Sequence, residues 1–374
     1  MNIIQAKFEI INQKYTKSNL LEDMFKHIEI CGRTCYKSED KITKDSYEKF
    51  ISMLEKSEHG AMLEHGTVYL TIPVGTPIDD PQYMWKMDIV RFFSSNKYSK
   101  VKKELVNENV EVEIKGYGMR TQASANFYYI TTNWRVIFES RDEGVVKYFL
   151  NNYHIDTENL KDSVLQWITP PTDKHEKRYT VRFTYHLAVA RDINRHRVQS
   201  IGEESTRYCN YSKEKFGGEL NYIEPVFLTD AEKKILNNPN EHLSLVEMCN
   251  QIGDGNNYSS FEALDYFIFA LEACEFAYIN LTKLGWKPQQ ASLVLPLATK
   301  TCSVHTAFAS DWCHFFNLRA LGTTGSPRPS AKEVAWPLME EFFTRGYISR
   351  NDVNEEKYDY IIEKYPNIED YIKL

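Results

Sequence analysis

The chain has 374 residues, of which 42% are hydrophobic, a length that allows two domains or one large domain with an insertion. Its formal net charge of -7 argues against general affinity for nucleic acid or for anionic membranes. Seven cysteines without a Cys-x-x-Cys pair argue against a disulfide framework, and no apolar run approaches membrane-spanning length, so we expect a cytoplasmic protein.

The first part of the sequence predicts two amphipathic helices followed by a strand. Apolar residues recur at helical spacing in residues 19–31 and again in residues 45–56. Residues 67–75 alternate between apolar and polar types and end at a glycine, which is typical of a half-buried strand.

About a hundred residues rich in Tyr, Asn and Lys come next, and their organisation resembles an insertion or a small subdomain. The apolar spacing predicts helices at 81–95, 141–153 and 158–168, and a strand at 110–115. The aromatic residues of this block (Tyr128, Tyr129, Trp134 and Phe138) could line a pocket, but ordinary packing is the better explanation.

The remainder of the chain returns to strong periodic patterns. Strands are predicted at 179–185 and 299–306, and helices at 310–320 and 331–344. The longest helical pattern covers 258–284, with Gly285 as its expected end, and could form part of the core or a subunit interface.

A cluster of arginines is the most informative feature of the sequence. Six of the fifteen arginines lie within residues 178–207, although the protein is acidic. At its centre, Arg195-His196-Arg197 is followed after seven residues by Ser205. If the preceding strand continued, Arg195 and Arg197 would share one face and could bind phosphate oxygens bidentately. The cluster therefore favours a site for a phosphorylated or other anionic ligand.

The alternative is that these arginines form structural salt bridges with acidic neighbours, namely Asp192, Glu203 and Glu204. The loop 202–208 favours binding instead, because backbone N–H groups, the Ser205 hydroxyl and Arg207 together resemble an anion cradle. Ser205 lacks the Gly-x-Ser-x-Gly surroundings of a nucleophile, so we expect it to bind a ligand.

Residues 59–65 combine two imidazoles with one carboxylate. Their spacing differs from the His pair of a helical zinc protease, and no later Cys or His pair completes a ligand set, so no metal site is predicted. In the structural alternative, a histidine caps the preceding helix and Glu64 pairs with an arginine of the cluster.

With these segments described, the chain resembles the flavin-dependent thymidylate synthases, the thymidylate synthase complementing protein family. The hallmark of that family is Arg-His-Arg, seven residues and Ser, which residues 195–205 match in full. Four flanking segments match in the same order: Cys31–Tyr36, His59–His65, Pro288–Pro296 and His314–Arg319. The resemblance covers residues 19–75 and 179–345.

The resemblance implies an α+β fold, with a twisted, mainly antiparallel sheet and long helices. A catalytic domain would comprise residues 1–75 and 179–350, interrupted by an inserted subdomain of unknown role at 76–178. Residues 351–374 would form a C-terminal tail.

The implied activity is the reductive methylation of dUMP to dTMP. Methylenetetrahydrofolate would supply the carbon, and FAD reduced by NADPH would supply the hydride. The implied assembly is a homotetramer with active sites between subunits, without nucleic acid or membrane partners.

The resemblance also implies roles for individual residues. The residues implied to bind FAD are His59, Glu64, Arg195, His196, Arg197, Glu203 and His314. Those implied to bind dUMP are Asp192, Arg195, Glu203, Glu204, Ser205, Thr206, Arg207 and Arg319. Arg319 would be the catalytic residue, because a permanent cation beside the uracil imide lowers the imide pKa and directs electron density toward carbon 5. No enzyme nucleophile is then required.

Some positions depart from the family pattern. Ser292 stands where an arginine is common, and Phe308 and Ser310 stand where Asn-x-Arg is common. Gly202 replaces Asn or Gln, and Asp192 replaces Gln or Glu. A lost charged contact costs roughly 1.5 to 3 kcal/mol if nothing replaces it, so we expect compensation from the inserted block or from Lys300.

Two other functions stay open from the sequence. One is a flavin-dependent enzyme that installs a hydroxymethyl group on dUMP. The other is a non-catalytic descendant that binds a nucleotide, which the residues at 292, 308 and 310 suggest.

Overall fold

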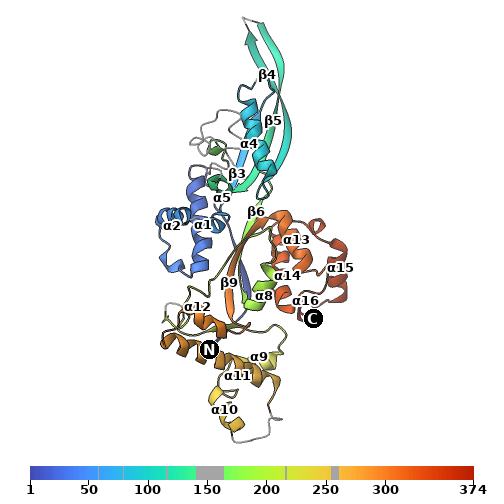
Figure 1. Ribbon diagram of the computed structural model, residues 1–374. Helices are drawn as coiled ribbons and strands as arrows, with labels where there is room; N and C mark the ends of the chain where they lie inside the picture. Colours follow the sequence, from blue (N-terminus) through green and yellow to red (C-terminus); the bar gives the residue numbers. More distant parts are fainter. Residues whose placement is uncertain (58, 79, 115–116, 140–163, 215–216, 254–260) are drawn as a thin grey trace.

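A computed structural model describes residues 1–57, 59–78, 80–114, 117–139, 164–214, 217–253 and 261–374, with residues 107–124 described for their backbone only. The molecule is elongated, and a four-stranded sheet runs through its middle (Figure 1). In spatial order the strands are β2 (Lys7–Ile11), β6 (Arg178–His186), β9 (Lys300–Phe308) and β7 (Ser200–Glu203). Every neighbouring pair is antiparallel. The α+β class with a mainly antiparallel sheet is therefore confirmed.

The two faces of this sheet differ in polarity because side chains alternate along each strand. On β6, Val181, Phe183 and Tyr185 are fully buried in the largest hydrophobic core. The intervening Thr180 and Arg182 point to the other face, where they contact the first helix. One face of the sheet is thus apolar, and the other is polar.

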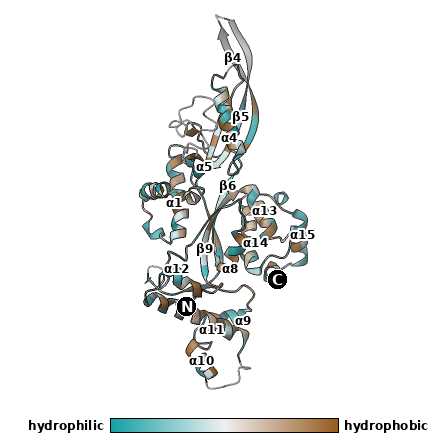
Figure 2. Cartoon of the chain, in the orientation of Figure 1, coloured by the Kyte–Doolittle hydropathy of each residue, from teal (hydrophilic) through white to brown (hydrophobic). Residues whose placement is uncertain are grey.

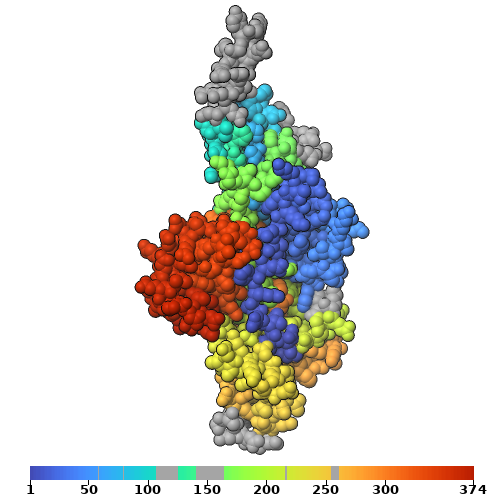
Figure 3. Space-filling model, turned by 180° about the vertical axis from the view of Figure 1, so that it is seen from behind, coloured from blue at the N-terminus to red at the C-terminus, as the bar shows by residue number. Residues whose placement is uncertain are grey.

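Helices cover the apolar face. They are α8 (Leu187–Ile193), α13 (Ala309–Arg319), α14 (Pro329–Thr344), α15 (Glu355–Lys364) and α16 (Ile368–Lys373). The segment expected to be a tail therefore folds into helices, and the Trp336 and Tyr358 rings stack at 5.6 Å. Figure 3 shows this C-terminal layer in red on one side of the molecule. The predicted helices at 310–320 and 331–344 are confirmed.

The polar face lies against the predicted N-terminal helices, which are also confirmed. These are α1 (Leu20–Tyr36) and α2 (Ser46–Lys56), followed by the short α3 (Gly60–Leu63). Their apolar residues form a second core together with the strand β3 (Thr67–Val74).

The predicted strand at 67–75 does not join the central sheet. β3 pairs along its whole length with β5 (Tyr117–Asn133), which in turn pairs with β4 (Lys100–Ile114). With α4 (Tyr83–Ser95) and α5 (Trp134–Glu139), these strands form the upper part of Figure 1. The strand expected at 110–115 is thus one end of a much longer strand. The division into domains stays a prediction.

Two other helices expected in this block lie largely outside the described residues. The range 141–153 is not described, and only 164–168 of the range 158–168 is.

The lower part of the molecule is helical, with one parallel strand pair. Its elements are β1 (Asn2–Ile4), β8 (Asn221–Ile223), α9 (Asp230–Leu236), α10 (Leu245–Gly253), α11 (Ala263–Lys283), α12 (Pro288–Ala291) and a 3-10 turn (Ser292–Val294). The predicted long helix begins at Ala263 rather than 258, after residues that are only partly described. Gly285 follows its end with a φ of 98°, a left-handed conformation that favours glycine.

Figure 2 shows hydrophobic residues along α11 and around α12 in this lower part. Phe276, Leu284 and Leu293 are 64%, 82% and 83% exposed. Within the described residues, no helix has both the length and the apolar character needed to cross a membrane.

Candidate active site

The arginine motif is not a continuation of the preceding strand, which corrects the expectation that Arg195 and Arg197 share a strand face. β6 ends at His186, α8 follows, and the motif lies in a turn after α8. Arg195 and Arg197 are exposed, whereas His196 is 5% exposed. Neither arginine has an ion pair within the described part of the chain, so the alternative of structural salt bridges is not realised for them.

The tertiary structure brings Arg319 to this motif from more than a hundred residues away. The Nε atom of Arg319 donates to Nε2 of His196 at 3.0 Å, and Nη2 donates to the backbone oxygen of Asp192 at 2.7 Å. The Asp192 carboxylate itself accepts a hydrogen bond from Arg328 at 2.9 Å. Arg319 lies at the end of α13, and its guanidinium is thereby fixed against the turn.

His196 is neutral in this environment. Burial, the nearby Arg319 guanidinium and His314 together lower the pKa of His196 to about 4. A neutral imidazole can accept the hydrogen bond from Arg319 at Nε2, which imidazolium could not. His314 is exposed, and its ring centre lies 5.9 Å from that of His196.

Glu203 and Glu204 follow on β7 and just after it. Glu203 accepts hydrogen bonds from Asn194 at 2.7 Å and from Thr301 at 3.1 Å, and burial raises its pKa. Asn194 therefore links the arginine motif to Glu203.

The Glu204 side chain is buried and forms an ion pair with Lys300. It also accepts a hydrogen bond from the Tyr211 hydroxyl at 3.0 Å. Lys300, which we expected to replace a missing arginine, is thus engaged by a carboxylate of this same chain.

The loop after β7 uses most of its backbone N–H groups internally, which corrects part of the predicted anion cradle. The N–H of Glu204 donates to Cys302 and that of Ser205 donates to Cys35, at 2.7 and 3.1 Å. In the described part of the chain, the N–H groups of Thr206 and Arg207 have no partner. The exposed Arg207 guanidinium donates to Gln289 at 3.1 Å. Side chains, more than backbone amides, are therefore left to bind an anion here.

A cavity of about 750 Å³ opens beside this loop, between α1, α2 and β7. Three of the predicted site residues line it: His59, Glu203 and Ser205. Its other lining includes the phenol groups of Tyr36 and Tyr208 and the cations of Arg33 and Lys49. Arg195, Arg197, His314 and Arg319 do not line it, so a single chain holds the predicted site residues in two groups.

The close approach of β7 to the helices requires glycine at position 202. A Cβ atom there would lie 2.5 Å from Sγ of Cys35 and 2.9 Å from Cε of Met62. The Asn or Gln common at this position in the resembling family has no room in this packing.

We therefore expect Gly202→Ala to lower the free energy of unfolding by about 1–3 kcal/mol, as for other overpacked cores. Urea denaturation at fixed protein concentration measures this change. The double variant Gly202→Ala/Cys35→Ala removes the closest clash and should recover most of the loss. Equal stabilities of the single and double variants would contradict this packing.

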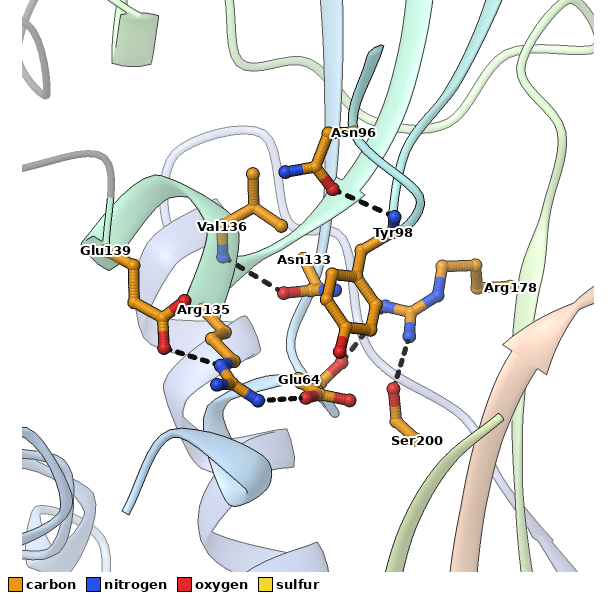
Figure 4. A network of polar contacts seen from close by, with 9 residues as sticks. All are labelled: Glu64, Asn96, Tyr98, Asn133, Arg135, Val136, Glu139, Arg178 and Ser200. Carbon is orange, nitrogen blue, oxygen red and sulfur yellow. Dashed lines mark hydrogen bonds and ion pairs between the residues drawn. The ribbon is translucent and has the colours of Figure 1, made fainter. Parts of the chain in front are cut away.

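Glu64 contacts the inserted block instead of the arginine motif (Figure 4). Its Oε1 accepts from Nη1 of Arg135 at 2.6 Å, and Arg135 also pairs with Glu139. The prediction that the Glu64 carboxylate pairs with an arginine of the 178–207 cluster is therefore wrong. Only its backbone oxygen accepts from Arg178, at 3.1 Å. No sequence signal identified Arg135, because its block has no counterpart in the matching segments.

The inserted block also reaches the positions where the family pattern is lost. Lys100 of β4 lies over the Phe308 ring at 4.7 Å and hydrogen-bonds to Ser310. Glu176 accepts from Lys100 at 2.9 Å and from Ser310 at 2.6 Å. Ser292 is half-buried, and its hydroxyl donates to the Gln289 backbone at 3.1 Å. A cation from the insertion thus lies beside Ser310.

The residues that flank the sheet include several neutral buried histidines. Burial lowers the pKa of His27 and of His305 to about 3, and that of His65 well below its usual value. His65 Nδ1 hydrogen-bonds to Thr306 at 2.8 Å, and His27 Nε2 to Thr180 at 2.9 Å. Among the described residues, no group of three His, Cys, Asp or Glu side chains could hold a metal ion.

These histidines predict acid sensitivity. Below pH 6.5 these imidazoles bind protons in the unfolded chain but stay unprotonated in the folded protein. The free energy of unfolding should therefore fall as the pH drops from about 6.5 toward 4. Each buried histidine contributes up to about 1.4 kcal/mol per pH unit. Urea midpoints across this range test it: His305→Gln should flatten the dependence, and His242→Gln, at a half-buried surface site, should not. A flat wild-type profile would rule the explanation out.

Comparison with known proteins is informative for the second half of the chain. Residues 176–344 match the family model described as thymidylate synthase complementing protein. A flavin-dependent thymidylate synthase from Thermosipho melanesiensis is 29% identical over 152 residues, which cover 39% of this chain and 58% of that protein. The chain thus spans little more than half the length of this relative.

Two solved structures show weak similarity. The UMP/dUMP methylase PolB from Streptomyces cacaoi, bound with 5-Br UMP, has a TM-score of 0.33 and 13% identity, covering 92% of this chain and 91% of that one. The flavin-dependent thymidylate synthase ThyX from Helicobacter pylori, complexed with FAD and dUMP, has a TM-score of 0.30 and 17% identity, covering 47% and 73%. With TM-scores this low, the assignment follows from the sequence matches. The part of the chain that matches the thymidylate synthase complementing protein family model, residues 176–344, includes the arginine motif and Arg319.

Proposed function

We propose that this protein catalyses the reductive methylation of dUMP to dTMP, with FAD as cofactor and methylenetetrahydrofolate and NADPH as co-substrates. One observation carries the proposal: Arg319 is fixed against His196 of the Arg-His-Arg motif, two residues from the Asn194 that holds Glu203. The motif, a carboxylate and the half-buried Arg319 guanidinium thus form one connected arrangement.

The side chains present suit a flavin dinucleotide. Arg195 and Arg197 are exposed and without carboxylate partners in the described part of the chain, and guanidinium groups bind pyrophosphate oxygens bidentately. FAD would be held by these two arginines together with His59, Glu64, His196, Glu203 and His314. When bound and reduced by NADPH, FAD supplies the hydride.

The protein's own groups would bind and polarise dUMP. Ser205, Thr206 and Arg207 would hold the phosphate, with Asp192, Arg195, Glu203 and Glu204 around the nucleotide. Arg319 remains cationic at physiological pH, since guanidinium does not lose its proton in proteins. Next to the uracil imide it would stabilise the deprotonated form and so activate carbon 5 without a covalent nucleophile.

We propose further that the active site is completed between subunits of a homotetramer. The cavity beside β7 contains His59, Glu203 and Ser205, whereas Arg195, Arg197 and Arg319 lie outside it. Exposed apolar side chains on and after α11 offer a surface for association, because large apolar patches commonly mark interfaces.

The proposal is tested with the purified protein. We expect flavin absorbance, NADPH oxidation that dUMP stimulates in the presence of methylenetetrahydrofolate, and a product with the mass of dTMP. A product heavier by one oxygen would identify a hydroxymethylating enzyme. Nucleotide binding without turnover would identify a non-catalytic protein.

The variant Arg195→Ala tests the proposed contact with FAD separately from the catalytic step. Loss of one charged contact to phosphate should weaken FAD binding by roughly ten- to a hundredfold, equivalent to 1.5–3 kcal/mol. Flavin occupancy after gel filtration measures it, with Arg345→Ala, at the residue that follows helix α14, as the matched control. Full occupancy in Arg195→Ala would show that this arginine does not contact FAD.

A further inference from the structure

A second cavity lies on another side of the molecule, between the N-terminal segment 11–15 and the start of β6. Its volume is about 190 Å³, and it shares no lining residue with the cavity beside β7. The residues that matter for its chemistry are Gln13, Tyr15, Tyr69, Lys177, Arg178 and Thr180. Two cations and several hydroxyl or amide groups line it, and no carboxylate does.

Arg178 is the unusual member of this lining. It is 7% exposed, yet among the described residues its guanidinium hydrogen-bonds only to neutral groups: the Glu64 backbone oxygen at 3.1 Å and hydroxyls of Thr67 and Ser200 at 3.3 and 3.2 Å. Its Nε atom is buried and has no partner among the described residues. Buried charges in proteins are normally paired with an opposite charge, whereas this guanidinium has no direct ion pair with any described residue.

The described surroundings of Arg178 do not supply that ion pair. The Glu64 carboxylate forms its ion pair with Arg135, and Glu64 and Asp311 attract Arg178 only at a distance, without a direct ion pair in the described part of the chain. Burial lowers the pKa of Lys177, whose ammonium donates to the Thr172 backbone oxygen. His27 Nδ1 and His65 Nε2 are also buried without a hydrogen-bond partner in the described part of the chain, and the Arg178 charge contributes to their low pKa values. Positive charge and unused polar nitrogens therefore gather around Arg178.

We propose that this cavity binds a small oxyanion of the phosphate class, held by the Arg178 guanidinium and the Lys177 ammonium. A volume of about 190 Å³ accepts a single phosphate or sulfate with a few waters, and excludes a nucleotide. The Tyr15 ring packs edge-on against Tyr69 in the same wall, with 5.4 Å between the ring centres. The bound anion supplies the charge that Arg178 lacks.

Binding at this cavity would act on the first site through Arg178. One arm of the guanidinium holds the backbone at Glu64, and the other holds Ser200, the first residue of β7. β7 also carries Glu203. An Arg178 side chain that is held in place therefore fixes the position of the segment before β3 relative to β7. The anion is thus a structural effector, distinct from the substrate phosphate.

The experiment compares thermal unfolding in sodium phosphate with that in sodium chloride of equal ionic strength. Phosphate should raise the melting temperature saturably, because a ligand that binds only the folded state stabilises it. Lys177→Gln should lose most of this response and Arg207→Ala should keep it, which separates this cavity from the proposed dUMP phosphate contact. Lys14→Gln, an exposed lysine of the same segment that does not line the cavity, is the charge-matched control.

Further measurements in sulfate and in acetate identify the class of anion. If the cavity binds tetrahedral oxyanions, sulfate should raise the melting temperature as phosphate does. A rise in acetate instead would indicate a site for carboxylates. A phosphate response that survives in Lys177→Gln but disappears in Arg207→Ala would overturn the proposal and assign the anion to the loop after β7. No response beyond that of chloride would overturn it as well. A response with the expected pattern in a protein without thymidylate synthase activity would leave this site standing and refute the proposed function alone.

Discussion

Arg319→Ala should reduce dTMP formation by roughly 10²- to 10³-fold, the loss typical of removing one preorganised group that stabilises transition-state charge. The expected cause is the loss of the cation that polarises the uracil ring. Flavin should remain bound, because the groups proposed to hold FAD are other side chains. Single-turnover formation of dTMP, measured with flavin occupancy on the same sample, tests this expectation.

The same variant has a second readout, which a merely structural role in α13 would not produce. Arg319 lowers the pKa of His196 and occupies its Nε2 atom, so removing the guanidinium should raise the pKa of His196 from about 4 toward its ordinary value. Arg319→Lys keeps a charge but loses the planar fork, and should restore activity only in part. Unchanged turnover in Arg319→Ala would refute the role given to this residue.

Lys300→Met should lower the free energy of unfolding by about 3 kcal/mol or more, because removing one partner leaves a buried charge uncompensated. The side chains of Glu204 and Lys300 are only 1% and 12% exposed. Burial acts to lower the pKa of Lys300, but the attraction and hydrogen bond of Glu204 outweigh it, and the net shift is upward. The pair fixes the loop that carries Ser205 against β9.

Chemical denaturation of the single and double variants tests the pair. Glu204→Gln/Lys300→Met should regain most of the stability that Lys300→Met loses, since no unpaired charge then remains. Lys233→Met is the matched control. Lys233 also forms an ion pair, with Glu224, but its side chain is more exposed than that of Lys300. A loss below about 0.5 kcal/mol in Lys300→Met would show that the pair contributes no more than an ordinary surface ion pair.

Periodic elements were predictable because a single local cause governs each of them. The apolar spacing in α1, α2, α11, α13 and α14 follows from burying one face of a helix, and the alternation in β6 and β9 follows from burying one face of a sheet. Short elements such as β1, β7 and α8 were missed, because three to seven residues do not contain enough repeats. The C-terminal helices α15 and α16 were missed because their polar faces dominate the composition.

The candidate site also has a part that local sequence predicted and a part that it did not. Motif spacing identified the arginine turn and Ser205, but the orientation of Arg195 and Arg197 depended on where β6 ended. The pairing of Glu64 with Arg135, and of Glu204 with Lys300, joins segments 71 and 96 residues apart. No local pattern encodes such a contact.

By itself the sequence determined the α+β class, the main helices and strands, and the resemblance of residues 176–344 to a known family. Only the tertiary structure decided that Arg319 hydrogen-bonds to His196, that the Cys35 sulfur leaves room only for glycine at position 202, and that Arg178 is buried without a direct ion pair among the described residues. The physical reason is that periodicity reflects the burial of one residue at a time, whereas charge compensation and close packing depend on which distant segments meet.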